Sequence, residues 1–255
     1  MNRIEVGSGL GGVPLVKTSQ AAWFLDIDGT LLELAETPDR VRVDQEVLNL
    51  LSELRTASGG AVALISGRSV AVVDSLFKPL RLPVAGQHGV ERRDAAGVTH
   101  FHQANGQTLA GVRHALAVWA AERPGLLLED KGLSLALHYR QAPTLEADVR
   151  RFIELMVAAS GGDFCLQSGK MVVEIKPAGR DKGTAIREFL DEAPFHGRIP
   201  VFVGDDVSDE YGFEIVNRLG GFAIKVGDEP TTASRRLPDV TAVREWLANV
   251  ARQTE

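Results

Sequence analysis

The segment AAWFLDIDGT, residues 21–30, places five apolar residues directly before two aspartates that a single isoleucine separates. A short apolar run that ends in charged or small residues is typical of a strand buried on both faces. Three other segments have the same form: residues 61–65 before Ser66, residues 172–175 before Lys176, and residues 199–203 before Gly204. A series of such strands favours a parallel sheet with helices on both faces.

Helical spacing of apolar residues follows the first of these strands and returns near the C-terminus. Val47, Leu51 and Leu54 repeat at helical intervals behind Asp44, whose side chain is a good helix N-cap. A similar pattern runs over residues 243–250. Because strands and helices alternate along the chain, we predict an α/β fold with a doubly wound, parallel-sheet, Rossmann-like core.

The middle of the chain has a different rhythm. A helical pattern over residues 107–123 is followed by two strand-like runs, which the turn-forming residues 129–132 separate. A second helical pattern over residues 144–160 is again followed by two strand-like runs, with a turn predicted at Ser168-Gly169. The order is helix, strand, strand, twice, which differs from the alternation of the rest of the chain.

We interpret this middle segment as a smaller α/β unit over residues 104–176, inserted into a core formed by residues 19–103 and 177–255. Residues 1–18 are predicted to be a flexible, glycine-rich leader. Glycines in this leader have the spacing of a dinucleotide-binding motif, but the flanking segments do not have the form of the strand and helix that such a motif needs.

The composition sets limits on partners and location. The 255 residues are 44% hydrophobic and 24% charged, as in soluble globular proteins, and no apolar run is long enough to span a bilayer. A formal net charge of -6 with no block of Lys or Arg argues against nucleic acid or membrane as a partner. Cys165, the only cysteine, is expected to be buried, and a chain that cannot form an internal disulfide is expected in the cytoplasm. We expect a monomer or a weak dimer.

Acidic and hydroxyl residues follow three of the predicted strands. Asp26, Ser66 and Asp205 all come at or just after strand ends, and ligands of open α/β sheets bind beyond the carboxyl ends of the strands. The surrounding aspartates would bring more negative charge to one place than a site holds without a counter-ion, and Mg²⁺ suits oxygen ligands. We predict Asp26, Asp28 and Asp205 as the metal ligands, with Asp206 and Asp209 around them.

Carboxylates, a cation, a hydroxyl and a lysine together suit phosphoryl transfer. Phosphate-monoester hydrolysis is so slow without a catalyst that one positioned proton transfer, contributing about 10²- to 10⁴-fold, supplies only a small part of the acceleration. We predict that Asp26 attacks phosphorus to form an aspartyl-phosphate, and that Asp28 acts first as acid and then as base. Ser66 and Lys182 are predicted to hold the phosphoryl oxygens.

Four motifs resemble, in order, those of the haloacid dehalogenase superfamily of phosphohydrolases. They are DIDGT at residues 26–30, ISGR at 65–68, DKGT at 181–184 and GDDVSD at 204–209. The resemblance covers roughly residues 21–230 and implies a magnesium-dependent hydrolase. It also implies that the middle segment, which lies between the second and third motifs, is the larger α/β cap of that superfamily.

Within the superfamily, GQHGVE at residues 86–91 and GDDVSDE at 204–210 resemble segments of the trehalose-6-phosphate phosphatase family. One departure is Ser208, where the family pattern leads us to expect threonine; the hydroxyl is kept. The resemblance implies hydrolysis of trehalose-6-phosphate to trehalose and phosphate. It implies that the cap binds the distal sugar through Glu129, Lys131 and Glu174, whose carboxylates and ammonium suit sugar hydroxyls. The remaining residues assigned to the substrate are Gly29, Thr30, Gly67, Arg68, Gln87 and His88.

Other interpretations of these residues exist. The first motif is not a calcium loop, because Leu31 and Leu32 occupy positions where that loop needs ligands. The turn at residues 129–132 has the composition of an ordinary solvated hairpin, and the acidic cluster at 205–209 has that of a helix N-terminus. At the level of function, the alternatives are another sugar phosphatase, a phosphosugar mutase, or a sensor that binds a phosphosugar without turnover.

Overall fold

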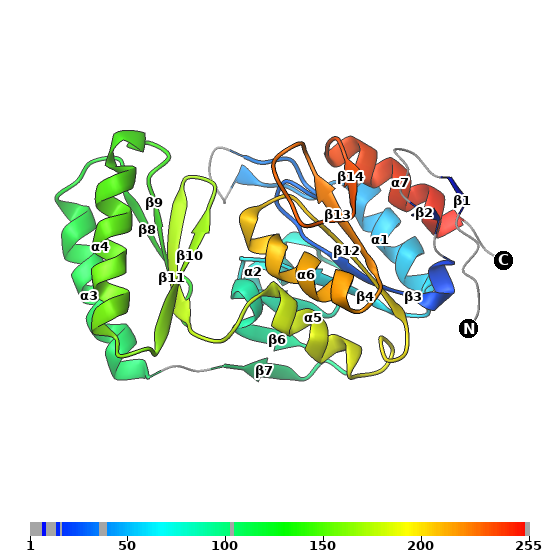
Figure 1. Ribbon diagram of the computed structural model, residues 1–255, viewed down its shortest axis with the longest axis horizontal. Helices are drawn as coiled ribbons and strands as arrows, with labels where there is room; N and C mark the ends of the chain where they lie inside the picture. Colours follow the sequence, from blue (N-terminus) through cyan, green and yellow to red (C-terminus); the bar gives the residue numbers. More distant parts are fainter. Residues whose placement is uncertain (1–6, 9–13, 16, 36–39, 103–104, 253–255) are drawn as a thin grey trace. The chain divides into compact units, whose positions relative to one another are not determined.

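The computed structural model describes residues 7–8, 14–15, 17–35, 40–102 and 105–252. The chain forms two compact units (Figure 1). The core unit comprises Met1–His100 and Asp181–Glu255, and the second unit comprises Phe101–Arg180. The segment predicted as an insertion lies inside the second unit, and its predicted first residue, 104, falls outside the described residues.

An eight-stranded sheet forms the centre of the core unit (Figure 1). In spatial order its strands are β14 (Arg235–Leu237), β13 (Phe222–Val226), β12 (Ile199–Gly204), β3 (Ala21–Leu25), β4 (Val62–Ile65), β5 (Val84–Gly86), β6 (Glu91–Arg93) and β7 (Thr99–Phe101). The pairs from β14 to β5 are parallel, which confirms the predicted parallel sheet, whereas β6 pairs with β5 in the antiparallel sense. The carboxyl ends of β3, β4 and β12 therefore meet at one edge.

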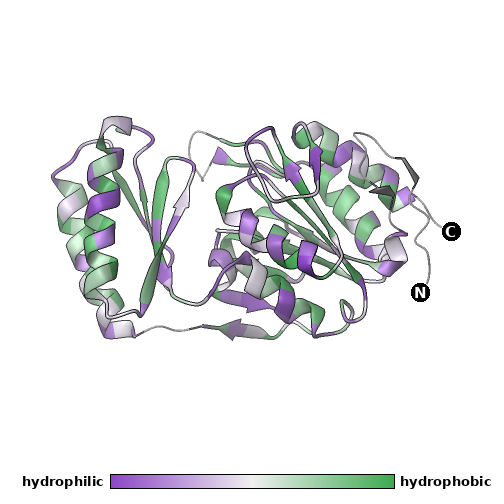
Figure 2. Cartoon of the chain, in the orientation of Figure 1, coloured by the Kyte–Doolittle hydropathy of each residue, from purple (hydrophilic) through white to green (hydrophobic). Residues whose placement is uncertain are grey.

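Helices cover both faces of this sheet, as a doubly wound fold requires. One face carries α1 (Gln45–Ala57), α2 (Val70–Leu76) and α7 (Val240–Arg252), and the other carries α5 (Lys182–Leu190) and α6 (Glu210–Arg218). Alternate residues of β3 serve the two faces: Trp23 packs on the first side and Phe24 on the second. The central strands are accordingly apolar along their length (Figure 2).

The predicted helix behind Asp44 is confirmed. Asp44 is the N-cap of α1, and its Oδ1 accepts a hydrogen bond from the amide of Val47 at 2.8 Å. The apolar stripe of α1 is buried against the sheet and α7, whose Trp246 lies with its ring centroid 5.7 Å from that of Trp23. Periodicity and cap signal together were therefore enough to place this helix.

The second unit follows the predicted order of helix, strand, strand, twice. Its elements are α3 (Gly106–Ala121), β8 (Leu127–Asp130), β9 (Leu135–His138), α4 (Glu146–Ala159), β10 (Phe164–Gly169) and β11 (Val172–Pro177). The strands form an antiparallel sheet in the order β10-β11-β9-β8. The run at residues 172–175 belongs to this sheet, so it is not a strand of the parallel core.

Two turns of the second unit differ from the predictions. The turn predicted at Ser168-Gly169 is wrong: β10 continues to Gly169, and the chain reverses at Lys170 and Met171, where Met171 has φ 61°. Met171 takes a left-handed conformation that sequence rules reserve for glycine or asparagine. The hairpin predicted at residues 129–132 begins later, because the first two of these residues still pair in β8.

The antiparallel sheet has two unlike faces. Leu135, Leu137 and Val173 pack with α3 and α4 in one apolar cluster. On the other face Glu174 and Glu129 both pair with Ala136, so the two carboxylates flank one small residue on neighbouring strands. This sheet therefore presents a row of acidic side chains opposite its helix-covered face.

Three smaller findings concern the leader, the cysteine and the membrane. Within the predicted leader, β1 (Gly7–Ser8) pairs with β2 (Pro14–Leu15), and the other glycines of its dinucleotide-like spacing lie outside the described residues. Thr18 is buried and donates a hydrogen bond to the carbonyl of Val250 at 2.7 Å. Cys165 is half-buried, which corrects the expectation of full burial. Among the described residues no helix has both the length and the apolarity to cross a membrane.

Candidate active site

Asp26 and Lys182 form the centre of the site. Asp26 directly follows β3 and is 4% exposed, and its amide donates to the carbonyl of Val203 in β12 at 3.0 Å. Lys182 is the first residue of α5, whose N-cap Asp181 accepts a hydrogen bond from the amide of Thr184. From this position the Lys182 Nζ atom reaches Asp26 Oδ1 at 2.7 Å.

Asp209 completes this arrangement from the other side. Its Oδ1 accepts from Lys182 Nζ at 2.7 Å, and its Oδ2 accepts from the amides of Asp205 and Asp206 at 3.0 and 2.9 Å. The side chain thus ties the loop after β12 to the start of α5. A Cβ at Gly204 would lie 2.3 Å from Asp209 Cγ, so only glycine leaves room for this aspartate.

Charge and burial oppose each other in this cluster. Burial disfavours the Lys182 ammonium, but the carboxylates of Asp209 and Asp26 outweigh it and raise the pKa of Lys182 above its usual value. Burial raises the pKa of Asp26 well above that of an ordinary aspartate; Asp209 and Asp205 add to this effect, and Lys182 opposes it. One lysine therefore does not balance the acidic groups around it.

The acidic groups fit a hard divalent cation. Asp26, Asp205 and Asp209 each offer one carboxylate oxygen, and the three oxygens lie within 4.8 Å of one another. All three residues are buried, so an ion there would be held in a region from which water is largely excluded. Oxygen ligands and excess negative charge are what Mg²⁺ prefers.

Asp28, the third ligand expected from the sequence, is placed differently. Its carboxylate receives two hydrogen bonds from one guanidinium, with Arg68 Nε 2.7 Å from Oδ2 and Arg68 Nη2 2.8 Å from Oδ1. The side chain is 30% exposed and is not one of the three clustered carboxylates. Arg68, which was expected to bind substrate, therefore orients Asp28.

Gly29 and Thr30 connect the first motif to the fourth. Gly29 has φ +82°, and a Cβ on it would lie 2.2 Å from Asp205 Oδ2, so a side chain at this position is excluded twice. Thr30 is fully buried, and its Oγ1 has no hydrogen-bond partner among the described residues.

Ser66 directly follows β4 and is held by a neighbouring turn. Its amide donates to the carbonyl of Ala85 at 2.8 Å, its carbonyl accepts from the amide of His88 at 3.0 Å, and its Oγ accepts from the amide of Arg68 at 3.1 Å. His88 itself lies against Gly67, where a Cβ would come within 2.7 Å of His88 Nε2. The second motif and the GQHGVE segment thus form one structure.

Gln87, expected at the substrate, has a partner within the protein that the sequence motifs did not predict. Its Nε2 donates to Glu91 Oε1 at 2.9 Å, and the same oxygen accepts from the amide of Val70 at 2.9 Å. Glu91 lies at the end of the GQHGVE segment, which was the available signal. Lys225 was not predicted from the sequence either. It is buried on β13 and donates a hydrogen bond to the carbonyl of Asp205, one of the three clustered aspartates.

A second polar cluster lies on the acidic face of the antiparallel sheet in the second unit. Glu174 is 4% exposed; its Oε2 accepts from Lys131 Nζ at 2.7 Å and its Oε1 from Ser134 Oγ at 2.7 Å. Glu129 lies 2.8 Å from His138 Nε2, a hydrogen bond that lowers the pKa of Glu129. The three residues expected at the sugar thus belong to one face, together with Ser134 and His138, which had not been assigned to it.

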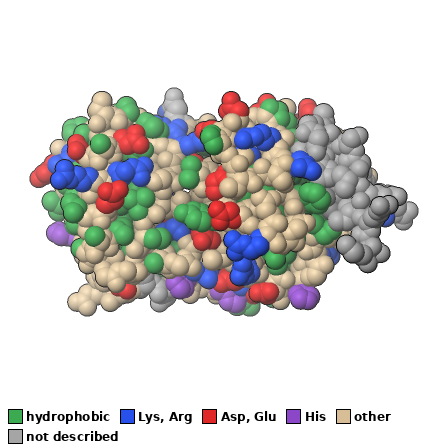
Figure 3. Space-filling model, in the orientation of Figure 1, with side chains coloured by type: hydrophobic (Ala, Val, Ile, Leu, Met, Phe, Trp, Pro, Cys, Tyr) green, Lys and Arg blue, Asp and Glu red, His purple; other side chains and the backbone are tan. Residues whose placement is uncertain are grey.

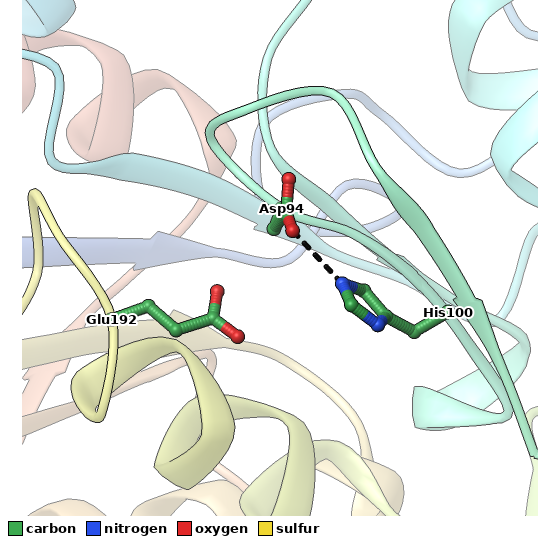
Figure 4. Close-up of side chains that lie close together, drawn as sticks. All are labelled: Asp94, His100 and Glu192. Atoms are coloured by element: carbon green, nitrogen blue, oxygen red, sulfur yellow. Dashed lines mark hydrogen bonds and ion pairs between the residues drawn. The ribbon is translucent and has the colours of Figure 1, made fainter.

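Another group of possible metal ligands lies on the core unit, at Asp94, His100 and Glu192 (Figure 4). His100 Nε2 is 2.8 Å from Asp94 Oδ2. Both carboxylate oxygens of Glu192 accept from the guanidinium of Arg92, at 2.7 and 2.9 Å. Because a guanidinium already neutralises Glu192, we interpret the group as ion pairs that join the sheet edge to the end of α5.

These features define a class. Buried carboxylates that follow β3 and β12, a buried lysine between Asp26 and Asp209, and a hydroxyl that follows β4 form the arrangement that the sequence motifs led us to expect of a phosphohydrolase. The fold is also found in a solved haloacid dehalogenase-like hydrolase from B. subtilis, which aligns with TM-score 0.65 at 15% identity, covering 92% of this chain and all of that one.

The trehalose-phosphatase family model matches residues 24–241, and the chain belongs to this family. It is 48% identical over 238 residues to the trehalose-6-phosphate phosphatase of Escherichia coli (strain K12), covering 92% of this chain and 89% of that protein. It is 44% identical over 240 residues to a probable trehalose-phosphate phosphatase of Sinorhizobium fredii (strain NBRC 101917 / NGR234), covering 90% and 87%. The crystal structure of a trehalose-6-phosphate phosphatase related protein aligns with TM-score 0.74 at 27% identity, covering 89% and 96%.

Proposed function

We propose that this enzyme hydrolyses trehalose-6-phosphate to trehalose and inorganic phosphate. The observation that carries the proposal is the contact of Lys182 Nζ with both Asp26 and Asp209, next to Asp205. It combines a buried carboxylate for attack with positive charge for the phosphoryl oxygens. The substrate is proposed from membership of the trehalose-phosphatase family.

In the first half of the reaction, an oxygen of the Asp26 carboxylate attacks phosphorus and forms an aspartyl-phosphate. The bond between phosphorus and the sugar oxygen breaks, and Asp28 gives its proton to that oxygen, so trehalose leaves as a neutral alcohol. In the second half, Asp28 takes a proton from water, and the resulting hydroxide releases phosphate and regenerates Asp26. The bidentate contact with Arg68 holds the Asp28 carboxylate in one position, and its partial exposure leaves it open to water. For Asp28 to carry the proton that it gives in the first half, one of these two contacts has to open.

The other core residues hold charge. Lys182 would place its ammonium between Asp26 and the phosphoryl oxygens, and the Ser66 hydroxyl would donate to one of those oxygens. Asp26, Asp205 and Asp209 are the residues that would hold Mg²⁺. Bound there, Mg²⁺ would neutralise the phosphoryl charge and the excess negative charge of the buried carboxylates. Gly29, Thr30, Gly67 and His88 would line the phosphate and the sugar next to it, with Gly29 leaving room for Asp205 and Gly67 leaving room for His88.

We assign the distal sugar to Glu129, Lys131 and Glu174 of the second unit. Carboxylates accept hydrogen bonds from sugar hydroxyls, and an ammonium donates to them. Ser134 supports the assignment because it holds Glu174 in place. Its hydroxyl donates to one carboxylate oxygen of Glu174, and the Lys131 ammonium donates to the other. We further propose that the enzyme acts in the cytoplasm as a monomer or weak dimer, without nucleic acid or membrane. The face in Figure 3 carries acidic and basic side chains interspersed.

The test is a panel of sugar phosphates assayed by phosphate release in the presence of Mg²⁺. We expect turnover of trehalose-6-phosphate to exceed that of glucose-6-phosphate, and Glu129→Gln, Lys131→Met and Glu174→Gln to reduce the former much more than turnover of p-nitrophenyl phosphate. Equal rates on the two sugar phosphates would rule out the proposed specificity and favour a general sugar phosphatase. Conversion of one phosphosugar into another without phosphate release would indicate a mutase.

The catalytic roles have their own test. Asp26→Asn should abolish turnover while the circular dichroism spectrum and the melting temperature remain those of a folded protein. Undiminished phosphate release by this variant would remove Asp26 as nucleophile. Binding of trehalose-6-phosphate by the unmodified protein without any turnover would identify a sensor instead.

A further inference from the structure

Glu91 is a buried carboxylate that the proposed mechanism does not use. It begins β6, at the antiparallel side of the core sheet, and is 8% exposed. One of its oxygens, Oε1, accepts two hydrogen bonds at 2.9 Å: from the side-chain amide of Gln87 and from the backbone amide of Val70. Val70 is the first residue of α2 and directly follows the loop Ser66–Ser69, whereas Gln87 lies in a different loop, so Glu91 joins the two loops.

The first of these loops, Ser66–Ser69, contains the second motif, and the other, Gly86–Val90, precedes Glu91. Backbone hydrogen bonds run between them: the amide of Gln87 donates to the carbonyl of Arg68 at 2.9 Å, and the amide of His88 to that of Ser66 at 3.0 Å. At Gly86 the loops approach so closely that a Cβ would lie 2.9 Å from both the Arg68 oxygen and the Val70 nitrogen. The Glu91 carboxylate adds a side-chain link between the two loops, through Val70 and Gln87.

The backbone of the second loop is strained. Gln87 has φ 48° and His88 has φ 55°, two successive residues with side chains in the left-handed region. Such conformations persist only where the surroundings impose them. The contact of Glu91 with the Gln87 side chain is one such constraint, because it fixes the first strained residue from the strand that follows.

The consequence reaches Asp28 through Arg68. Arg68 shares its loop with Ser66, its amide donates to Ser66 Oγ at 3.1 Å, and its guanidinium holds both oxygens of the Asp28 carboxylate. A shift of this loop would therefore move Arg68, which orients Asp28, without altering Asp26, Lys182 or Asp209, which are held by other elements. Ser66, which begins the loop, keeps a separate anchor, because its amide donates to the carbonyl of Ala85 in β5 at 2.8 Å.

We propose that Glu91 is a positioning residue for protonation of the leaving group: it locks the Ser66–Ser69 loop so that Arg68 presents Asp28 in one orientation. The inference rests on the proposed function, in which Asp28 is the acid. It predicts a selective defect. Loss of Glu91 should slow substrates whose leaving oxygen needs a proton and spare those whose leaving group is stable as an anion.

The experiment compares Glu91→Leu with Glu91→Gln on two substrates. For Glu91→Leu we expect kcat on trehalose-6-phosphate to fall by roughly 10- to 100-fold, part of the range for positioned acid catalysis, with KM within about threefold. On p-nitrophenyl phosphate, whose leaving group needs no proton, kcat should stay within about threefold. Glu91→Gln keeps an oxygen acceptor for both donors and should restore most of the activity. If Glu91→Leu does not fold, Glu91→Asp, which is too short to reach both donors, takes its place.

Arg198→Met is the matched control. Arg198 Nη1 donates to the carbonyls of Ser19, Ala21 and Ser58, at the opposite ends of β3 and β4 from Asp26 and Ser66, so its loss should lower the melting temperature and leave both kcat values unchanged. An equal loss on both substrates in Glu91→Leu, or no rescue by glutamine, would overturn the proposal. Asp28→Asn distinguishes failure of the proposed function from failure of the proposal on Glu91. If Asp28→Asn does not slow trehalose-6-phosphate more than p-nitrophenyl phosphate, the role of Asp28 as acid is wrong. If Asp28→Asn shows this selectivity and Glu91→Leu does not, only the role of Glu91 is wrong.

Discussion

Lys182 Nζ lies 2.7 Å from Oδ1 of Asp26, and both side chains are almost completely buried. Because Asp209 is equally close, replacing the lysine leaves two neighbouring carboxylates without their shared cation. We expect Lys182→Met to lower kcat by about 10²- to 10³-fold, as for loss of one group that stabilises transition-state charge. Stability without Mg²⁺ should fall by about 3–5 kcal/mol, the usual cost of breaking a buried pair.

The same variant should respond more strongly to Mg²⁺ than the unmodified protein. Removing the ammonium leaves excess negative charge beside the three clustered carboxylates, so the metal should bind more tightly and raise the melting temperature further. Scanning calorimetry with EDTA and with Mg²⁺ measures both shifts, and Lys17→Met, at an exposed lysine, is the control. A smaller shift in Lys182→Met than in the control would contradict a cation site at these carboxylates.

Two glycines with nearly the same backbone separate strain from crowding. Gly29 has φ +82° and Gly97 has φ +86°, but a Cβ at Gly29 would lie 2.2 Å from Asp205 Oδ2, whereas nothing lies within 4 Å of one at Gly97. Gly97→Ala should cost about 1–2 kcal/mol from the left-handed conformation alone and keep full activity. Gly29→Ala should in addition displace Asp205 and reduce kcat at subsaturating Mg²⁺ by at least tenfold. Titration of activity with Mg²⁺ is the measurement; equal kinetics in the two variants would show that Gly29 is needed only for its backbone.

The strands that carry the site could be predicted because a strand buried on both faces is a continuous apolar run in the sequence. An apolar run followed by an acid or a hydroxyl marks a buried strand and its carboxyl end, and it correctly placed Asp26, Ser66 and Asp205 just after parallel strands of one sheet. Strand β6 has no such apolar run. It consists of Glu91, Arg92 and Arg93, and it is buried because each charge has a partner on another element, as Arg93 has in Asp74 at 2.5 Å. Pairing across the fold, and not hydropathy, stabilises that strand.

The contacts between side chains within the site could not be predicted from the sequence, for a related reason. Arg68 and Asp28 are forty positions apart, and their contact depends on where the loop after β4 turns. That turn depends on the left-handed backbone of Gln87 and His88, and a conformation that only a small fraction of such residues adopt does not follow from residue type. Motif order placed these residues at one edge of the sheet, but their pairing requires the three-dimensional path of two loops.

Stability at low pH should report the cap of α1. The hydrogen bond from the Val47 amide, and then the charge of Arg244, hold the pKa of Asp44 below its usual value. A depressed folded pKa gives stability that is fully present above the unfolded value, about 3.9, and is lost as pH falls through the folded value. Asp44→Asn keeps a cap acceptor but cannot titrate, so its deficit against the unmodified protein should be constant near neutral pH and shrink below about pH 4. Urea unfolding from pH 7 to pH 3 tests this. A deficit that grows towards low pH would contradict the assignment.

The Lys131–Glu174 pair in the second unit allows a test of burial itself. Its side chains are 11% and 5% exposed, whereas those of the Arg113–Asp130 pair, which joins α3 to the end of β8, are 37% and 45% exposed. Lys131→Met should destabilise the second unit by about 3–5 kcal/mol, because Glu174 keeps a buried charge without that lysine. Arg113→Met should cost less than about 1 kcal/mol. Hydrogen exchange of amides in β9 and β11 follows both variants. Adding Glu174→Met to Lys131→Met should recover most of the lost stability, since replacing both members of a buried ion pair by apolar side chains often leaves stability unchanged. If stability is not recovered, the pair stabilises the sheet by more than mutual neutralisation of its charges.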